Sequence, residues 1–222
     1  MKTIAIIPAR GGSKRLPGKN LLPLGGLPLI AHSILYAQAN PDIIDAVFVT
    51  TNDPEIRKVA REYGAEVIDR PAELSGDLEP TSSALRHAVL QLDSDVENIV
   101  LLQPTNPLRP ANLLAEAFEQ YQNRNAPSLF TVTRSERKLG KIENNRFCPT
   151  NYTFGQRSQD LEPQFYENGL LYISRRSLIL NNEIIRADAF PFEIDPDFPI
   201  VDIDSMTDYK YAQYLYNLKK QG

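Results

Sequence analysis

Near the start of the chain, an apolar run leads directly into a basic, glycine-rich loop: IAIIPARGGSKRLPGKN, residues 4–20. The apolar part, Ile4–Ile7, is too short for a signal peptide or a membrane span and predicts a buried strand. Glycine lets a backbone turn tightly and approach a ligand, and exposed backbone N–H groups act with cations to bind phosphate. The loop offers both, with Gly11, Gly12 and Gly18 set among the cations Arg10, Lys14, Arg15 and Lys19. The alternative is a solvated basic loop, but its position directly after the first strand favours a phosphate site.

Strand and helix patterns alternate from this loop onward. Further strands are expected at Ala46–Thr50, Glu66–Ile68, Ile99–Leu102, Leu129–Val132 and Leu170–Ile173. Helices are expected at Pro28–Ala39, Pro54–Tyr63, Thr81–Leu92, Ala111–Asn123 and Met206–Leu218. Short apolar strands between amphipathic helices predict an α/β fold, in which helices cover both faces of a mostly parallel sheet. The length of 222 residues fits a single domain over 1–222.

Composition and charge exclude several classes of protein. Lys and Arg number 24 against 28 Asp and Glu, so the net charge is −4 and the chain is a poor match for nucleic acid. The single cysteine, Cys148, excludes an internal disulfide and suits a reducing compartment, so we expect a cytoplasmic location. No segment is long and apolar enough to predict a membrane span. His32 and His87 form no cluster with the cysteine, which disfavours a zinc site.

Ligands of such folds lie beyond the carboxyl ends of the strands. This rule directs attention to five loops: Ala9–Asn20, Thr51–Asp53, Arg70–Thr81, Gln103–Arg109 and Asp202–Asp204. Arg70 can hold an anion or the edge of a base, and the hydroxyls of Thr81 and Ser82 open a helix, although capping alone would also explain them. Gln103 follows a buried strand and can offer hydrogen bonds from a loop that prolines stiffen.

Two carboxylates, Asp202 and Asp204, alternate with apolar residues near the end of the chain. Alternation along an extended segment places both on one face, where neighbouring charges need a cation or a shared proton. Oxygen ligands suit Mg²⁺, which shares itself with waters and phosphate oxygens. The competing interpretation is that Asp204 or Ser205 caps the last helix while Asp202 is solvated, and the sequence favours neither.

The polar stretch 135–167 interrupts the alternation of strands and helices. It contains Lys138, Lys141 and Arg146 and at most a short hairpin. We therefore expect an excursion from the main sheet that serves as a flap or a dimerisation arm.

Taken together, these loops resemble those of one known family. Ile7–Asn20 resembles the signature of the acylneuraminate cytidylyltransferases, the CMP-sialic acid synthetases. Further segments agree with that family in the same order: Arg70–Leu74, Leu102–Thr105, Gln159–Leu161, Glu167–Gly169 with Tyr172, and Asp202–Asp204. The resemblance spans nearly the whole chain and implies a Rossmann-like nucleotidyltransferase fold and a homodimer, with 135–167 reaching across it.

The resemblance also implies a role for each matching residue. Those implied to bind the nucleotide are Ala9, Arg10, Gly11, Gly12, Ser13, Lys14, Lys19, Asn20, Arg70, Asp77, Thr81 and Ser82, with Arg10, Lys14 and Lys19 on the triphosphate. Those implied to contact the sugar are Gln103, Asn168 and Tyr172, with Arg157 nearby. Asp202 and Asp204 are implied to hold Mg²⁺, and together with Arg10 and Lys14 they form the implied catalytic set.

The reaction implied by the resemblance joins CMP from CTP to the anomeric hydroxyl of a 2-keto-3-deoxy sugar acid and releases pyrophosphate. The expected acceptor is N-acetylneuraminate or a close nonulosonate, with Kdn, legionaminic acid, pseudaminic acid and Kdo as alternatives. Kdo is disfavoured, because Kdo enzymes usually carry Lys-Pro where this chain has Lys19-Asn20. A nucleotide-binding module without catalysis is a remote alternative, disfavoured by the presence of both Asp202 and Asp204. The chain departs from the family at Arg134–Lys138, where histidines are common.

Overall fold

The computed structural model describes residues 2–195 and 197–221. Its centre is a seven-stranded sheet in the order β11-β7-β10-β6-β1-β4-β5. The strands are β1 (Lys2–Pro8), β4 (Ala46–Thr51), β5 (Glu66–Asp69), β6 (Val96–Leu101), β7 (Ser128–Ser135), β10 (Gln164–Arg175) and β11 (Phe190–Ile194). β1 pairs in parallel with β4 and β6, as do β4 with β5 and β7 with β11, whereas β10 runs antiparallel between β6 and β7. The predicted mostly parallel sheet is confirmed.

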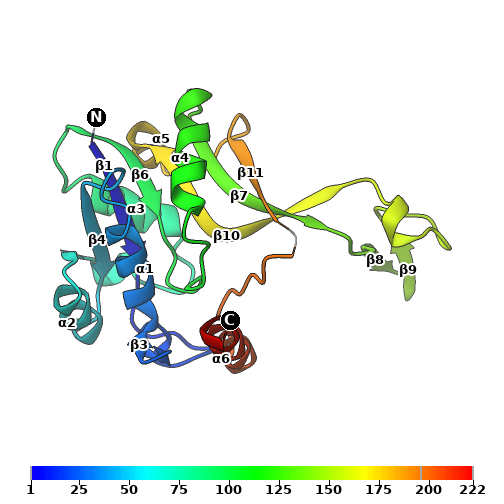
Figure 1. Cartoon of the computed structure of the whole chain (residues 1–222), viewed down its shortest axis with the longest axis horizontal. Coiled ribbons are helices and arrows are strands. Elements are labelled where there is room, and N and C mark those ends of the chain that lie inside the picture. Colours follow the sequence, from blue (N-terminus) through cyan, green and yellow to red (C-terminus); the bar gives the residue numbers. More distant parts are fainter. Residues whose placement is uncertain (1, 196, 222) are drawn as a thin grey trace.

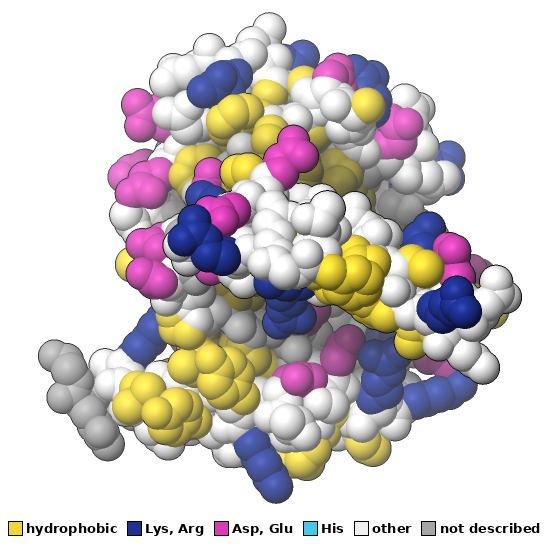
Figure 2. All heavy atoms as spheres, turned by 90° about the vertical axis from the view of Figure 1, so that its right-hand side faces the viewer, with side chains coloured by type: hydrophobic (Ala, Val, Ile, Leu, Met, Phe, Trp, Pro, Cys, Tyr) yellow, Lys and Arg dark blue, Asp and Glu magenta, His cyan; other side chains and the backbone are white. Residues whose placement is uncertain are grey.

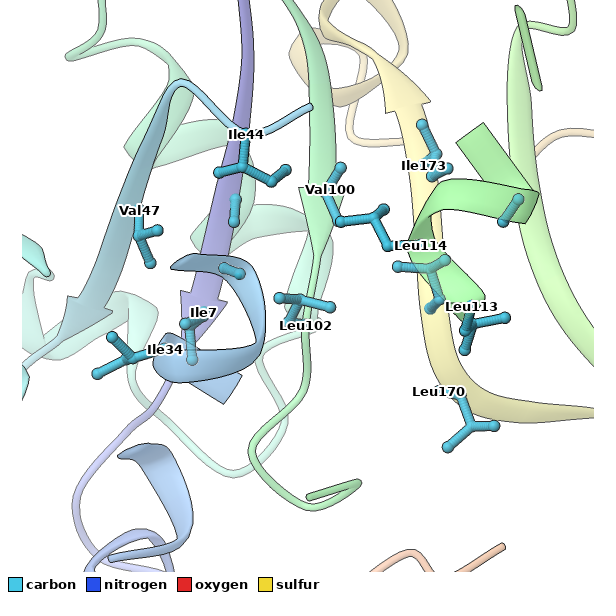
Figure 3. Packing of buried hydrophobic residues seen from close by; sticks show 14 of the residues in the cluster. Ile7, Ile34, Ile44, Val47, Val100, Leu102, Leu113, Leu114, Leu170 and Ile173 are labelled. Atoms are coloured by element: carbon cyan, nitrogen blue, oxygen red, sulfur yellow. The ribbon is translucent and has the colours of Figure 1, made fainter. Parts of the chain in front are cut away.

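Helices cover both faces of this sheet, as predicted (Figure 1). Side chains of α1 (Leu29–Gln38), α2 (Pro54–Glu62) and α4 (Leu113–Asn123) pack against Ala5 and Ile7 of β1. On the opposite face, α3 (Thr81–Val89) and α5 (Arg176–Leu180) pack against Ile4 and Ile6. Successive side chains of a strand point to opposite faces, so one apolar run supplies both cores. Figure 3 shows the first of these cores, between α1, α4 and the sheet.

Element boundaries differ from the sequence expectations at several places. α3 ends at Val89 rather than Leu92, and β7 and β10 are both longer than predicted. α5 and β11 were not predicted: α5 is a single short turn of helix, and Pro191 weakens the strand pattern of β11. The predicted cap of α2 is present, because the Asp53 carboxylate accepts from the backbone N–H groups of Glu55 and Ile56.

The segment 135–167 leaves the sheet as an arm (Figure 1). β7 and β10 stay paired to its base, where Ser135 lies opposite Gln164. Beyond them lie the hairpin of β8 (Gly140–Glu143) and β9 (Arg146–Pro149) and a 3-10 turn at Ser158–Asp160. The hairpin turns at Asn144 and Asn145, whose positive φ values of 51° and 61° suit a tight two-residue turn. Figure 2, which looks at this end of the molecule, shows apolar side chains exposed beside basic ones.

A third cluster anchors the end of the chain to the basic loop. α6 (Met206–Gln221) packs Tyr209, Ala212 and Leu215 against Leu16 and Leu24, close to the small ribbon of β2 (Pro23–Leu24) and β3 (Leu27–Pro28). This packing carries the segment before α6 to the carboxyl ends of the strands. Within the described residues, no helix is both long and apolar enough to cross a membrane.

Candidate active site

A cavity of ≈ 270 Å³ lies beyond the carboxyl ends of the parallel strands. Residues from four of the five predicted loops line it: Arg10, Ser13, Lys19, Asn20, Arg70, Thr81, Gln103, Asp202 and Asp204. The fifth loop, Thr51–Asp53, contributes Asp53 to an adjoining hollow of ≈ 340 Å³, together with Gly11, Gly12, Lys14 and Asp77. Chain topology thus brings together residues that lie up to 194 positions apart, as the separation of Arg10 and Asp204 shows.

The basic loop is shaped by its glycines. Gly12 and Gly18 adopt φ values of +69° and +65°, and residues with a Cβ rarely adopt such values. A Cβ on Gly11 would lie 2.6 Å from Asp53 Oδ2, so only glycine lets the loop lie against the start of α2. Ala9 N–H donates to the Thr50 carbonyl at 3.0 Å, and Asn20 Nδ2 donates to the Arg10 carbonyl at 3.0 Å. The buried Asn20 therefore holds the loop closed through its Nδ2 while it also lines the cavity.

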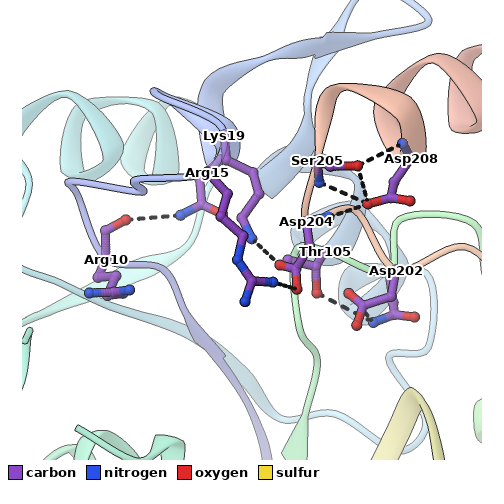
Figure 4. Close-up of polar contacts among 10 residues, drawn as sticks. Arg10, Arg15, Lys19, Thr105, Asp202, Asp204, Ser205 and Asp208 are labelled. Atoms are coloured by element: carbon purple, nitrogen blue, oxygen red, sulfur yellow. Dashed lines mark hydrogen bonds and ion pairs between the residues drawn. The ribbon is translucent and has the colours of Figure 1, made fainter. Parts of the chain in front are cut away.

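Carboxylates of the chain itself hold the cations of this loop. Arg10 Nη1 donates to Asp77 Oδ1 at 2.8 Å and to the Ser75 carbonyl at 3.2 Å, and Lys14 pairs with the same Asp77. Lys19 Nζ lies 2.8 Å from Asp204 Oδ1, and Arg15 Nη1 lies 3.4 Å from Asp204 Oδ2 (Figure 4). The Lys14 side chain is 82% exposed, whereas that of Lys19 is 14% exposed. Of these two lysines, Lys19 is therefore the one held in place in the cavity lining.

Arg70 is a buried cation beside the cavity. Its Nη2 donates to the Thr50 carbonyl at 2.5 Å, while its Nε has no partner among the described residues. Burial, helped by the charge of Arg10, lowers the pKa of Arg70 to about 10. A bound anion would neutralise the buried charge of Arg70 and would give its Nε a hydrogen-bond acceptor. Both effects suit the predicted role of Arg70 at the nucleotide.

Thr81 lies at the first position of α3 and lines the cavity, whereas Ser82 does not. Pro80 occupies the N-cap position, and no side-chain oxygen makes a cap hydrogen bond there. Helix capping, the alternative explanation for these hydroxyls, is therefore not what the structure shows.

The segment Val201–Asp204 alternates as predicted. Val201 and Ile203 are buried in the third cluster, while Asp202 and Asp204 line the cavity. Ile203 N–H donates to the Thr105 carbonyl at 2.9 Å, which fixes the segment beside the loop that contains Gln103.

The cap of α6 is made by other residues than Asp204. Asp208 Oδ2 accepts from both the backbone N–H and the hydroxyl of Ser205, each at 2.8 Å, and Ser205 Oγ accepts from Asp208 N–H at 3.3 Å (Figure 4). This is a reciprocal capping box. Ser205 capping is thus confirmed, while the Asp204 carboxylate faces Lys19 and Arg15 instead.

The donor set of Asp202 and Asp204 fits Mg²⁺. Both are carboxylates on one face of an extended segment, and both open into the cavity that the basic loop borders. Across the described residues, no group of three or more His, Cys, Asp or Glu forms a complete cage. Mg²⁺ characteristically takes one or two carboxylates and fills its other positions with water and phosphate oxygens.

A second cavity of ≈ 450 Å³ adjoins the first and shares Gln103 and Asp202 with it. Its remaining walls are Tyr166, Glu167, Asn168, Gly169, Tyr172 and Ile200. The Tyr172 hydroxyl donates to Glu167 Oε1, and burial, followed by the carboxylate of Glu167, raises the pKa of Tyr172.

The buried Asn168 amide is engaged inside the sheet. Its Oδ1 accepts from Thr131 Oγ1 at 2.5 Å and from Leu170 N–H at 3.1 Å, and its Nδ2 donates to Thr133 Oγ1 at 3.0 Å. The amide therefore holds β10 against β7, and only the rest of Asn168 borders the second cavity.

Arg109 is a structural residue of the site that sequence reasoning did not single out. Its guanidinium, 7% exposed, donates to the carbonyls of Leu170 at 2.6 Å and Gln103 at 2.8 Å and to Ser33 Oγ at 3.1 Å. Burial lowers the pKa of Arg109 to about 10. The available signal was a cation between Pro107 and Pro110, in the loop that follows a buried strand.

The structure does not bring Arg157 to either cavity of its own chain. Arg157 lies on the arm and forms a two-pronged ion pair with Asp160, with Nε–Oδ2 and Nη2–Oδ1 distances of 2.8 and 3.0 Å.

Comparisons with known proteins agree with this geometry. The family model described as cytidylyltransferase matches residues 4–221. The chain is 33% identical to the pseudaminic acid cytidylyltransferase of Campylobacter jejuni strain 81-176, over 100% of this chain and 99% of that protein. It is 32% identical to the N-acylneuraminate cytidylyltransferase of Streptococcus agalactiae strain NEM316, over 94% of this chain but 52% of that longer protein.

Among solved structures, a CMP:2-keto-3-deoxy-manno-octonic acid synthetase complexed with CTP superposes with a TM-score of 0.76 at 18% identity, covering 99% of this chain and 100% of that one. This match supports the nucleotidyltransferase fold. Because the family model matches nearly the whole chain, a range that includes the basic loop and both aspartates, the chain belongs to the cytidylyltransferase family.

Proposed function

We propose that this chain transfers CMP from CTP to the anomeric hydroxyl of a sialic-acid-like nonulosonic acid and releases pyrophosphate. The observation that carries the proposal is the pair of adjoining cavities that share Gln103 and Asp202. The first is bordered by the basic loop and suits a nucleoside triphosphate. The second is lined by hydroxyl, amide and carboxylate groups and suits a polyhydroxylated sugar, so the two substrates would meet at Asp202.

In the nucleotide cavity, Arg10, Lys14 and Lys19 hold the triphosphate, as the basic loop predicts. The backbone of Ala9, Gly11, Gly12 and Ser13 follows the phosphates. Asn20, Arg70 and Thr81 line this cavity and are assigned to the nucleotide as well, whereas Ser82 lies outside the lining and Asp77 pairs with Arg10 and Lys14. The buried charge of Arg70 supports an anionic or strongly polar partner at this end.

Transfer requires one bond to form and one to break. The anomeric oxygen attacks the α-phosphorus, the bond to the bridging oxygen of the β-phosphate breaks, and the hydroxyl proton leaves to solvent. Arg10 and Lys14 neutralise the charge that gathers on pyrophosphate, which is the main contribution of protein groups in such transfers. Asp202 and Asp204 would hold Mg²⁺, which would supply Lewis-acid polarisation of the phosphate.

In the sugar cavity, Gln103 and Tyr172 present side-chain groups to the acceptor, and Asn168 contributes to the wall. The acceptor carries a carboxylate, yet none of the described residues lining this cavity is Lys or Arg. A cation must therefore come from elsewhere. We assign it to Arg157 on the arm of a second copy, because the arm projects away from the sheet (Figure 1) and Arg157 lines neither cavity of its own chain. The proposed enzyme is a cytoplasmic homodimer.

The choice of a nonulosonic acid rests on the relatives. The matched proteins are named for pseudaminic acid, N-acylneuraminate and N,N'-diacetyllegionaminic acid, the last from Legionella pneumophila at 30% identity. Kdo is the acceptor of a neighbour that is only 18% identical.

A pyrophosphate-release assay with CTP, Mg²⁺ and one sugar acid at a time tests the proposal. The panel is N-acetylneuraminic, legionaminic, pseudaminic and Kdn acids, with Kdo as the distant comparison. We expect release with at least one nonulosonic acid and its loss on adding EDTA. Pyrophosphate release with Kdo alone would contradict the proposed nonulosonic acid acceptor. No release with any sugar acid, while CTP still binds, would favour a nucleotide-binding module without catalysis.

A further inference from the structure

Glu167 and Tyr172 lie on one strand but meet in one cavity. They are an odd number of residues apart on β10, and a regular strand would point them to opposite faces of the sheet. The pairing of β10 with β7 shifts between these two residues: Glu167 lies opposite Val132 and Tyr172 opposite Phe130. This bulge turns both side chains into the second cavity, where the Tyr172 hydroxyl donates to Glu167 Oε1.

The bulge is built from specific residues. Gly169 has a φ of +77°, and a Cβ there would lie 3.0 Å from Asn106 Nδ2 and 3.4 Å from Gln103 Oε1. The buried Asn168 amide ties the bulge to Thr131 and Thr133. These contacts hold the pair in a fixed position, because Tyr172 is only 6% exposed while Glu167 lies at the open side.

The position of Glu167 tells which part of a sugar acid it meets. Asp202 and Gln103 border both cavities, whereas Glu167 borders only the second. The reacting carbon bears the substrate carboxylate and must lie at the shared end. Glu167 therefore lies on the acceptor side of the shared residues, where a nonulosonic acid presents hydroxyl and acylamino groups.

An ionised carboxylate is an acceptor only. With the Tyr172 hydroxyl on Oε1, Glu167 Oε2 has no partner among the hydrogen bonds of the described residues. We propose that Glu167 is a specificity-determining residue, which accepts a hydrogen bond from a hydroxyl or acylamino N–H of the sugar acid while Tyr172 holds its carboxylate in place. This inference rests on the proposed function.

The test measures steady-state pyrophosphate release for wild type, Glu167→Ala and Glu167→Gln, with the sugar acid of highest turnover in the panel above. Hydrogen bonds to charged groups contribute about 1.5–3 kcal/mol, so Glu167→Ala should raise the KM for the sugar about 10- to 100-fold. The KM of Glu167→Ala for CTP should stay within about twofold of the wild-type value. The sugar KM of Glu167→Gln should lie between those of wild type and Glu167→Ala, because an amide oxygen still accepts a hydrogen bond. Glu119→Gln on the exposed surface of α4 is the matched control and should change neither KM.

A second arm varies the substrate. Wild type should discriminate against analogues that lack one hydrogen-bond donor, such as the 4-, 7- and 9-deoxy forms, and Glu167→Ala should lose that discrimination for one of them. An unchanged sugar KM in Glu167→Ala, or an equal rise of the sugar KM and the CTP KM, overturns the inference. The proposed function still stands in that case, because wild type turns over the sugar acid. Absence of wild-type turnover with every sugar acid would instead remove the proposed function itself.

Discussion

Arg10 Nη1 donates to Asp77 Oδ1 at 2.8 Å, and Lys14 pairs with the other carboxylate oxygen, Oδ2, of the same residue. One carboxylate thus occupies two of the three cations assigned to the triphosphate. The adjacent Lys14 and then Arg10 hold the pKa of Asp77 below its usual value, so the carboxylate is charged at neutral pH. A bound triphosphate must compete with Asp77 for these cations.

Asp77→Asn should therefore lower the KM for CTP. The pairs are exposed and individually weak, so we expect a decrease of about two- to fivefold at low salt. The effect should shrink in about 1 M salt, where the screening length is about 3 Å. The exposed Asp42 precedes β4 at the opposite end of the sheet, and Asp42→Asn is the matched charge control. A higher KM for CTP would instead mean that Asp77 contacts the nucleotide directly.

Asp202→Asn and Asp204→Asn should each lower kcat by about 100-fold or more, because each removes one of the carboxylates assigned to Mg²⁺. Titration with Mg²⁺ should show a higher concentration for half-maximal activity in both variants. Asp42→Asn again serves as the control for loss of one negative charge. Wild-type kcat and wild-type Mg²⁺ dependence in Asp202→Asn would remove its metal role.

The stability of the fold at acid pH depends on Asp208. Hydrogen bonds from Ser205, and then from the Asp204 backbone, lower the pKa of Asp208 in the folded state. A carboxylate with a depressed folded pKa stabilises the fold fully above its unfolded pKa of about 3.9, and this contribution is lost as pH falls through the folded value. Asp208→Ala should cost about 1 kcal/mol at pH 7, as loss of a helix cap does. Thermal melts should show the gap to wild type narrowing below about pH 4, and a constant gap would contradict the cap.

The sequence predicted which loops meet, because the carboxyl ends of parallel strands share one edge of a sheet. That rule predicts that Arg10, Arg70, Gln103 and Asp202 lie close together, and the structure shows all four lining one cavity. It could not predict the Asp77 pairs, because they depend on how the loop after β5 folds back over the basic loop. The sequence alone also could not decide between Asp204 and Ser205 as the cap of α6, since both residues favour that position.

The bulge in β10 marks another limit of prediction. Sequence alternation assigns faces only on a regular strand, where Glu167 and Tyr172 would point to opposite faces. Gly169 signalled an irregularity but not its direction. Arg109 was overlooked for a related reason: a buried cation that binds carbonyl groups has no charged partner in the sequence to reveal it.

Arg109→Leu should destabilise the fold by about 2–4 kcal/mol, because it leaves the carbonyls of Leu170 and Gln103 without their donor. Urea unfolding measures this loss. The exposed Arg61→Leu on α2 is the control and should change the free energy of unfolding by less than about 0.5 kcal/mol. In the folded fraction of Arg109→Leu, the sugar KM should rise more than the CTP KM, because the freed Leu170 directly follows Asn168 and Gly169, which line only the sugar cavity. Equal changes in both would limit Arg109 to a general structural role.

The arm is expected to complete the sugar cavity of a second copy. Its apolar side chains Ile142 and Phe154 are 79% and 74% exposed, and the double variant Ile142→Asp with Phe154→Asp should shift the protein from dimer to monomer in light scattering after gel filtration. Arg157→Ala alone should leave the dimer intact and raise the sugar KM. Mixing Arg157→Ala subunits with Asp202→Asn subunits should restore activity, because one site of each heterodimer combines an intact Asp202 with an intact partner arm. Random exchange puts half of the dimers in this state with one working site each, so recovery should approach about a quarter of wild type. No recovery after verified subunit exchange would mean that Arg157 does not act across a dimer.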